Sequence, residues 1–321
     1  MNRCNYCDNE YDCGMDRDKD QGWWCDYCDG YNYFDSKQET RKFTLLLEDK
    51  VSKSYGYKNK YRNLNKRLSP LRYPGGKSKI TDLILERLNL NNTKTLVGAY
   101  AGGASAELAL LHAGIIDELI LNDKDYGIYS LFQIIKHTPH ELINRINAHK
   151  PTKEDYFDYR AKIKSKYFGC SPIEAAWSLL VVNRLAYSGI FKANPLGGIQ
   201  GKQDTLLSRW NPDNLIKRIL TIHSMSDRIT VLNVDACELI EEMYWKNNTT
   251  IFIDPPYVKQ GENLYLHFYS ENDHYELRNL LESLHTGFPG ADLILFYDKD
   301  ELIENIYSHP VIEIIGRKFS V

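Results

Sequence analysis

Short apolar runs alternate along the chain with longer segments whose apolar positions recur at helical spacing. The runs at 95–97, 119–121, 250–253 and 293–297 are rich in Leu, Ile, Val and Phe, and each has the length of a buried strand. The stretch between the first two runs is helical in pattern and stops at Gly114, a residue type that commonly ends helices. Strands that alternate with helices predict an α/β fold with a doubly wound, mostly parallel sheet.

The pattern changes between residues 129 and 228, where the segments "ELINRINAH", "KEDYFDYRAKIKSKYF" and "PIEAAWSLLVVNRLAY" have helical character. This block predicts a helical domain inserted into a sheet domain made of residues 69–128 and 229–321. Basic residues exceed acids in the block, and they include Lys150, Lys153, Arg160, Lys162, Lys164, Lys166, Arg184, Lys192 and Lys202.

Composition adds little to this picture. With 321 residues, 43% hydrophobic and 26% charged, the chain is an ordinary globular protein. The net charge of −3 does not indicate a nucleic-acid binder as a whole, so the local charge of the helical block matters more. No apolar run is long enough to span a bilayer, and the first residues lack the apolar core of a signal peptide. We therefore expect a cytoplasmic protein without a membrane partner.

Most of the cysteines lie at the start of the chain, between Met1 and Cys28. Two C-x2-C pairs, "CNYC" and "CDYC", have the spacing of small zinc ribbons. The four cysteines of these pairs are Cys4, Cys7, Cys25 and Cys28. The pattern predicts a zinc-ribbon-like segment over residues 1–34 that holds a structural zinc ion, with Cys13 as a spare ligand. A disordered leader that carries cysteines, or a redox pair, is the alternative.

Residues 35–68 are basic, and tyrosines are interleaved at positions 55, 57 and 61. Such a segment is either a phosphate-binding arm or a solvated linker with a short helix near "FTLLLEDKV".

The most informative stretch is "TIFIDPPY", residues 250–257. Proline cannot continue a central strand, so the strand stops at Asp254 and the chain turns rigidly at Pro255 and Pro256. The Asp254 carboxylate and the Pro255 carbonyl would then offer two adjacent acceptors to an exocyclic amino group such as adenine N6. Tyr257 could stack on the base. A strand-ending turn is the plain structural alternative.

The sequence "AYAGGAS" at 99–105 follows a predicted strand and precedes a helix. Gly102 and Gly103 allow a ligand to approach the backbone closely, although a Gly pair can also mark only a tight turn. Asp123 ends the next strand about twenty residues later, where an acid can bind ribose hydroxyls. Neither G-x-G-x-x-G nor a P-loop lysine is present, so a nucleoside without phosphates fits best. Asp235 is a candidate for the nucleoside's adenine, or a helix N-cap.

These motifs together resemble the Dam-like DNA adenine-N6 methyltransferases over about residues 71–307. The matching segments are "LRYPGGKSKI", "VGAYAGGASAEL", "LNDKD", "NRLAYSGIFK" and "FIDPPY". The resemblance implies a Rossmann-like methyltransferase fold, S-adenosylmethionine as the methyl donor, double-stranded DNA as the substrate and an adenine flipped out of the helix. It makes the inserted helical domain the target-recognition domain. A cognate restriction endonuclease is a partner that such enzymes can have.

The resemblance also implies roles for individual residues. Catalysis would involve Asp254, Pro255, Pro256 and Tyr257. The cofactor would be bound by Tyr73, Lys77, Tyr100, Ala101, Gly102, Gly103, Asp123, Asp235 and Asp254. DNA would be contacted by Arg184, Tyr187, Ser188 and Lys192.

Two departures from the family pattern are visible. Gly98 and Ala99 stand where the family has an acidic residue and a proline, which predicts weak cofactor binding. Lys192 stands where the family has an arginine, and a lysine cannot make the bidentate contact to guanine that arginine makes, so a GATC target does not follow. A non-catalytic DNA-binding relative, and an enzyme acting on RNA or single-stranded DNA, are the alternative functions. The D-P-P-Y motif alone would also admit N4-cytosine methylation.

Overall fold

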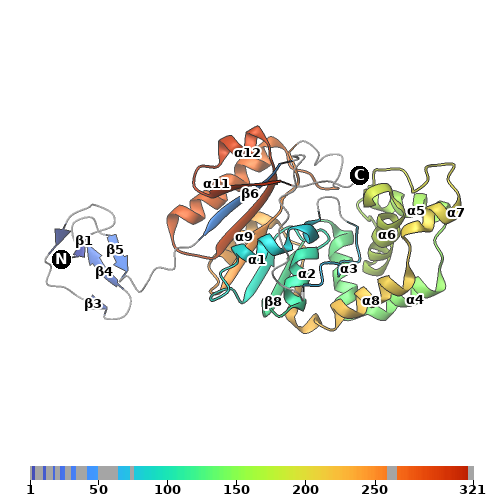
Figure 1. The fold of residues 1–321 in the computed structure, drawn as a ribbon, viewed down its shortest axis with the longest axis horizontal. Helices are drawn as coiled ribbons and strands as arrows, with labels where there is room; N and C mark the ends of the chain where they lie inside the picture. The colour runs from blue at the N-terminus through green and yellow to red at the C-terminus, as the bar shows by residue number, and fades with distance from the viewer. Residues whose placement is uncertain are drawn as a thin grey trace. The chain divides into compact units, whose positions relative to one another are not determined.

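The computed structural model describes residues 42–49, 64–72, 76–258 and 266–316, together with short strands between Asn2 and Tyr33 (Figure 1). The chain divides into two compact units, Met1–Arg41 and Lys42–Val321. In the first unit β1 (Asn2–Arg3) pairs antiparallel with β2 (Glu10–Tyr11). A second antiparallel sheet contains β3 (Arg17–Asp18), β4 (Gly22–Cys25) and β5 (Gly30–Tyr33).

The second unit is built on a seven-stranded sheet in the order β12-β6-β11-β10-β7-β8-β9, and every pair in it is parallel. Its strands are β6 (Phe43–Asp49), β7 (Thr95–Gly98), β8 (Glu118–Asn122), β9 (Ile229–Leu232), β10 (Thr249–Ile253), β11 (Asp292–Asp298) and β12 (Val311–Gly316). The predicted strands that precede the glycine loop, Asp123 and Asp254 are confirmed, and so is the α/β class.

Strand β6 corrects one expectation. One of the two interpretations of residues 35–68 places a short helix near "FTLLLEDKV"; it is wrong there, because Phe43–Asp49 lie in the sheet between β11 and β12. Leu45 and Leu47 pack on one face of the sheet and Leu46 packs on the other. A strand that is buried on both faces is apolar throughout, so its sequence lacks the alternation that would identify it. The compact unit that holds the sheet accordingly begins at Lys42.

Helices cover both faces of the sheet (Figure 1). One face packs against α1 (Thr81–Arg87), α2 (Ser105–His112) and α3 (Tyr126–His137), whose apolar side chains share a core with Leu96, Phe252 and Phe296. The other face packs against α9 (Ala236–Tyr244), α11 (Glu271–Gly287) and α12 (Glu301–Ile306), around Val97, Ile251 and Leu295. Three layers of this kind are the arrangement that an open parallel sheet requires.

A run of helices follows β8 and precedes β9. After α3 come α4 (Pro139–Ala148), α5 (Lys153–Lys164), α6 (Pro172–Leu185), α7 (Gln203–Leu206) and α8 (Pro212–His223). Figure 1 shows α4 to α8 grouped at the end of the unit away from α11 and α12. Their core is continuous with the helical layer on the α2 face, because Trp177 and Leu180 of α6 belong to the same apolar cluster as Leu96. This block therefore does not separate from the sheet as a second compact unit.

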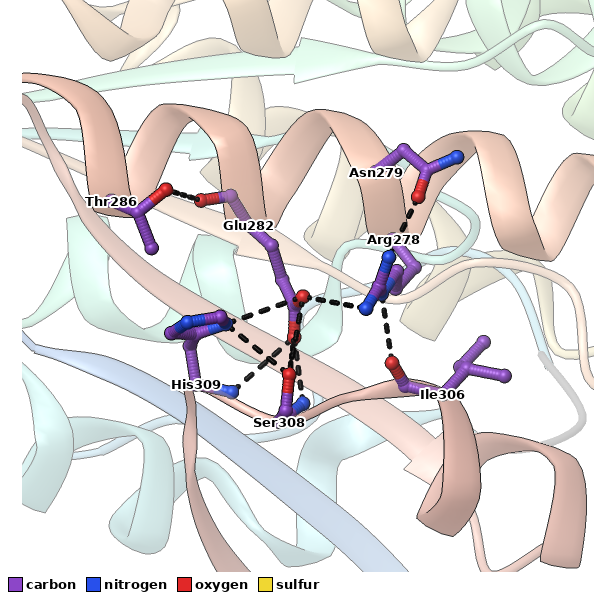
Figure 2. Close-up of polar contacts among 7 residues, drawn as sticks. All are labelled: Arg278, Asn279, Glu282, Thr286, Ile306, Ser308 and His309. Carbon is purple, nitrogen blue, oxygen red and sulfur yellow. Dashed lines mark hydrogen bonds and ion pairs between the residues drawn. The ribbon is translucent and has the colours of Figure 1, made fainter.

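A carboxylate on α11 fastens the chain before the edge strand β12 (Figure 2). Glu282 accepts backbone hydrogen bonds from Ser308 at 2.6 Å and from His309 at 3.3 Å. Its second oxygen lies 3.0 Å from Arg278, and the Arg278 Nε donates to the Ile306 carbonyl. Burial raises the pKa of Glu282, but these donors outweigh burial and leave the pKa below its usual value.

Within the described ranges, none of the helices has the length and apolar character needed to cross a bilayer.

Candidate active site

A pocket lies at the carboxyl edge of the sheet, where β10, β7 and β8 end side by side. Because the three strands are neighbours, the loops that follow them converge on one place. The pocket wall contains nine of the residues predicted from the sequence, namely Lys77, Tyr100, Ala101, Gly102, Gly103, Asp123, Asp235, Asp254 and Pro256. Pro255 and Tyr257 are buried beside this wall and do not line the pocket.

The glycine loop between β7 and α2 is held by its neighbour β8. The Ala101 N–H donates to the Asn122 carbonyl at 2.7 Å, and the Gly102 N–H donates to the Asp123 carboxylate at 2.8 Å. Gly102 adopts a φ of 48°, in the left-handed region that favours glycine. The loop therefore turns sharply enough to bring the first residue of α2, Ser105, to the pocket wall.

Asp123 is a buried carboxyl that is already oriented by the backbone. One oxygen accepts from Gly102, and the other accepts from the Asp125 N–H at 2.9 Å. Burial, followed by repulsion from Asp125, raises the pKa of Asp123 to about 7 despite these two donors. A carboxyl oxygen can accept more than one hydrogen bond, so Asp123 can still accept from a ribose hydroxyl in the pocket.

Asp235 has two partners and also lines the pocket. One oxygen caps α9 by accepting from the Cys237 N–H at 2.9 Å, so the helix-cap role considered from the sequence is confirmed. The other oxygen lies 2.9 Å from the Lys124 ammonium, and both side chains are more than a third exposed. A cap and a pocket contact are compatible, because the two oxygens point to different partners.

Lys77 joins the two halves of the site. It lies in a short 3-10 helix, Lys77–Lys79, and its side chain is 4% exposed. Its ammonium is 2.5 Å from the Asp254 carboxylate, 3.1 Å from the Tyr257 hydroxyl and 4.1 Å from the centre of the Phe296 ring. The residue predicted to hold cofactor therefore also contacts the predicted catalytic carboxylate and its neighbouring tyrosine.

The pocket contains further polar residues that the sequence did not single out. They are Glu107, Asn122, Lys124, Asp125, His267 and Tyr269. Asn122 donates to the carbonyls of Ala99 and Val234 and accepts from the Val234 N–H, so it fixes the β7 and β9 loops relative to each other. Its position directly before Asp123 was a usable signal. Glu107 lies within the quoted segment "VGAYAGGASAEL", in the first turn of α2, but a charged residue in a helical pattern does not by itself indicate a pocket side chain, and Tyr269 lies in a loop before α11.

The predicted DNA-contacting residues lie in two environments. Tyr187 is 55% exposed, and Ser188 and Lys192 are also at the surface. Arg184, on α6, is only 7% exposed. Burial and the nearby charges of Arg218 and Arg72 lower its pKa to about 9. The guanidinium groups of Arg184, Arg218 and Arg72 therefore lie near one another.

Asn183 ties this segment to the chain before Lys77. Its amide oxygen accepts from the Arg72 N–H at 2.7 Å, and its amide nitrogen donates to the carbonyls of Arg72 and Gly189. These bonds hold the end of α6 against the segment that precedes the pocket.

Some predicted residues lie outside the described residues. They are Tyr73, Cys4, Cys7 and Cys28. Only the backbone of Cys25 is described, as the last residue of β4. In the part of the chain that the structure describes, no cluster of three or more His, Cys, Asp or Glu residues could hold a metal ion. The zinc site stays a prediction.

Comparison with protein families agrees with this geometry. The family model for D12 class N6 adenine-specific DNA methyltransferases matches residues 73–320, about three quarters of the chain. The match includes the whole pocket and the helical block between β8 and β9. The chain therefore belongs to the D12 class N6 adenine-specific DNA methyltransferase family.

Proposed function

We propose that the protein transfers a methyl group from S-adenosylmethionine to N6 of an adenine that has been flipped out of double-stranded DNA. The observation that carries the proposal is the shared pocket of Asp254, the Gly102–Gly103 loop and Asp123. It brings a nucleoside-binding wall and an amino-group acceptor within reach of one ligand. Extrusion of the base is required because adenine N6 is inaccessible to in-line attack inside a duplex.

The pocket residues suit S-adenosylmethionine. Asp123 would accept from the ribose hydroxyls, and Asp235 would accept from the cofactor's adenine amino group. The backbone of the loop from Tyr100 to Gly103 would lie against the sugar and the methionine chain, and Tyr73 and Lys77 would complete the cofactor site, as the family resemblance implies. When bound, the cofactor supplies a methyl group on a sulfonium, whose positive charge already activates transfer.

The acceptor half of the site would act on the adenine amino group. The Asp254 carboxylate and the Pro255 carbonyl would accept the two N6 hydrogens, which turns the nitrogen lone pair out of conjugation and toward the methyl group. Asp254 would also take the proton that N6 loses when it accepts the methyl group. The Lys77 ammonium lies 2.5 Å from the Asp254 carboxylate and would orient it as an acceptor before the base arrives.

The base and the duplex would be held by different elements. Tyr257 would stack on the flipped adenine while Pro256 keeps the turn rigid. Tyr257 is only 7% exposed, so the face of its ring must be uncovered when the base enters. The helical block at 129–228 would serve as the target-recognition domain, with Tyr187, Ser188 and Lys192 at its surface. Arg184 is mostly buried, and its charge would add to that of Arg72 and Arg218 in attracting a DNA phosphate.

Transfer of a labelled methyl group tests the proposal. Duplex DNA of mixed sequence, single strands of the same sequence and RNA are incubated with labelled S-adenosylmethionine and the full chain. We expect label on adenine N6 of the duplex and none with Asp254→Ala. Label on cytosine, or a preference for single strands or RNA, would redirect the substrate assignment. Cofactor binding without any transfer would support a non-catalytic DNA-binding relative.

We also propose that Cys4, Cys7, Cys25 and Cys28 bind one structural zinc ion. Cys25, the first cysteine of the second C-x2-C pair, is the last residue of β4, and two such pairs can complete a tetrahedral site. Elemental analysis of protein purified without chelator should find about one zinc per chain, released by thiol modification. Reduced cysteines without metal would remove the zinc ribbon from the proposal.

A further inference from the structure

The departure at Gly98 leaves a space that another side chain occupies. Gly98 is the last residue of β7, and a Cβ placed on it would lie 3.4 Å from the Glu107 Oε1 and 3.6 Å from the Glu107 Cγ. Glu107 comes from the first turn of α2. Its carboxylate therefore lies at the end of β7, beside the position from which a side chain on residue 98 would begin.

Glu107 is a buried carboxyl that faces the pocket. It is 3% exposed and forms part of the pocket wall. Lys77, whose charge acts on it, is paired with Asp254. Among the residues that the structure describes, no lysine or arginine forms an ion pair with Glu107. A buried carboxylate in this state is costly to ionise, and a cationic ligand group would remove that cost.

We propose that Glu107 binds the α-ammonium group of the cofactor's methionine end, in place of the acid that residue 98 lacks. The inference rests on the proposed function and assigns one subsite within it. S-adenosylmethionine carries an ammonium group at the end of a flexible chain. The glycine loop donates to Asp123, the proposed ribose partner, at Gly102 and continues into α2, where Glu107 lies. The acidic side chain near the ammonium group would thus come from Glu107 on α2 instead of from residue 98 at the end of β7. The absence of an acid at Gly98 then has no cost in cofactor affinity.

The charge state of Glu107 makes the subsite sensitive to pH. Burial raises its pKa to about 7, against the N–H groups of the α2 first turn, and the charges of Asp254 and Lys77 act in opposite directions. The ammonium group binds only to the ionised form. Affinity for a ligand with that group should rise from pH 6 to pH 8, whereas affinity for a ligand without it should change less.

Titration calorimetry with two ligands tests the assignment. S-adenosylhomocysteine carries the ammonium end, and 5′-methylthioadenosine shares the nucleoside and lacks the amino-acid end. Glu107→Gln keeps the shape of the side chain. We expect it to lower the affinity for S-adenosylhomocysteine roughly ten- to hundred-fold and to leave the affinity for 5′-methylthioadenosine within about two-fold of the parent. Glu282→Gln, a change of the same type at a buried carboxylate outside the pocket, should alter neither.

The outcomes separate this inference from the proposed function. A folded parent protein that binds neither ligand would overturn both. A parent that binds both, with Glu107→Gln indistinguishable from it, would overturn only the Glu107 subsite. If Glu107→Gln lowered the affinity for both ligands equally, the Glu107 subsite would also be overturned, because the change would be a general one in the pocket. The double variant Gly98→Glu with Glu107→Gln should regain affinity for S-adenosylhomocysteine relative to Glu107→Gln alone.

Discussion

Two buried carboxylates, Glu282 on α11 and Glu107 on α2, show how the same group serves structure in one region and the site in another. Glu282 receives two backbone donors and the Arg278 guanidinium, and its pKa lies below its usual value. Glu107 is more deeply buried, and its pKa is raised to about 7. A carboxylate whose partners are all in place, such as Glu282, thus stabilises the fold. Glu107 lines the pocket and forms no ion pair with a cation among the described residues, so it is available for a ligand.

The largest effect should come from the acceptor half of the pocket. Asp254→Ala should lower methyl transfer by at least about 1000-fold, because it removes an acceptor that acts only as the bond forms. The fold should persist, since Asp254 ends a strand and is not part of the apolar core. Turnover and thermal unfolding measure the two properties. Transfer within a few-fold of the parent would contradict the mechanism.

The structural carboxylate should show the opposite pattern. Glu282→Ala leaves the Ser308 and His309 N–H groups and the Arg278 guanidinium without their acceptor. We expect it to lower the free energy of unfolding by about 3–5 kcal/mol, measured by chemical denaturation. Glu107→Gln should change the stability at pH 5 little, because Glu107 is protonated there in the folded protein. Equal destabilisation by both variants would erase the distinction between the two carboxylates.

Stability should depend on pH in opposite directions at the two positions. The folded protein holds a proton on Glu107 up to about pH 7, whereas the unfolded chain loses it near pH 4.5. Stability of the ligand-free protein should therefore fall as pH rises between these values, by on the order of 3 kcal/mol for this group. Asp123, whose pKa is also raised to about 7, adds to the same slope.

Glu282 has a lowered pKa, so its contribution is present at neutral pH and is lost as pH falls through its folded value. Unfolding free energies between pH 3 and pH 8 test both slopes. Glu107→Gln should reduce the slope of the unfolding free energy against pH above pH 4.5, and Glu282→Gln should reduce that slope below pH 4.5. A Glu107→Gln curve that is parallel to that of the parent would show that Glu107 has no raised pKa.

A smaller effect is expected at Tyr257, where two functions belong to different parts of one side chain. Tyr257→Ala removes the ring that would stack on the base and should lower turnover by about ten-fold or more, since such stacking contributes roughly 1–3 kcal/mol. Tyr257→Phe keeps the ring and removes only the hydroxyl that contacts Lys77. It should lower turnover less. Equal losses in steady-state turnover would argue against the stacking role.

The smallest effect should come from restoring an acid at position 98. Gly98→Glu in the parent places a second carboxylate against Glu107, whose Oε1 would be 3.4 Å from the new Cβ. We expect cofactor affinity to stay within a few-fold of the parent or to fall, because the ammonium group already has its partner. Calorimetry with S-adenosylhomocysteine measures it. A marked gain in affinity would show that Glu107 does not fill this role.

The α/β class, the strands before the three loops of the pocket, and the positions of Asp123 and Asp254 at strand ends could all be predicted from the amino-acid sequence. Short apolar runs and rigid prolines fix these features locally, and adjacent parallel strands bring their loops together. The helix-cap role of Asp235 was also within reach of sequence analysis, since an aspartate directly before a helical pattern is a common cap.

Which residues from distant parts of the chain share the site could be seen only in the folded protein. Strand β6 joins the sheet through pairing with β11 and β12, which come from the far end of the chain, and its three consecutive leucines, Leu45–Leu47, do not show the alternation of a strand. Lys77 contacts Asp254 although the whole helical block lies between them in the sequence, and Glu107 fills the space beside Gly98 because α2 packs back over β7. Burial, and with it the pKa of each carboxyl, depends on what surrounds a residue in three dimensions. Local periodicity does not contain that information.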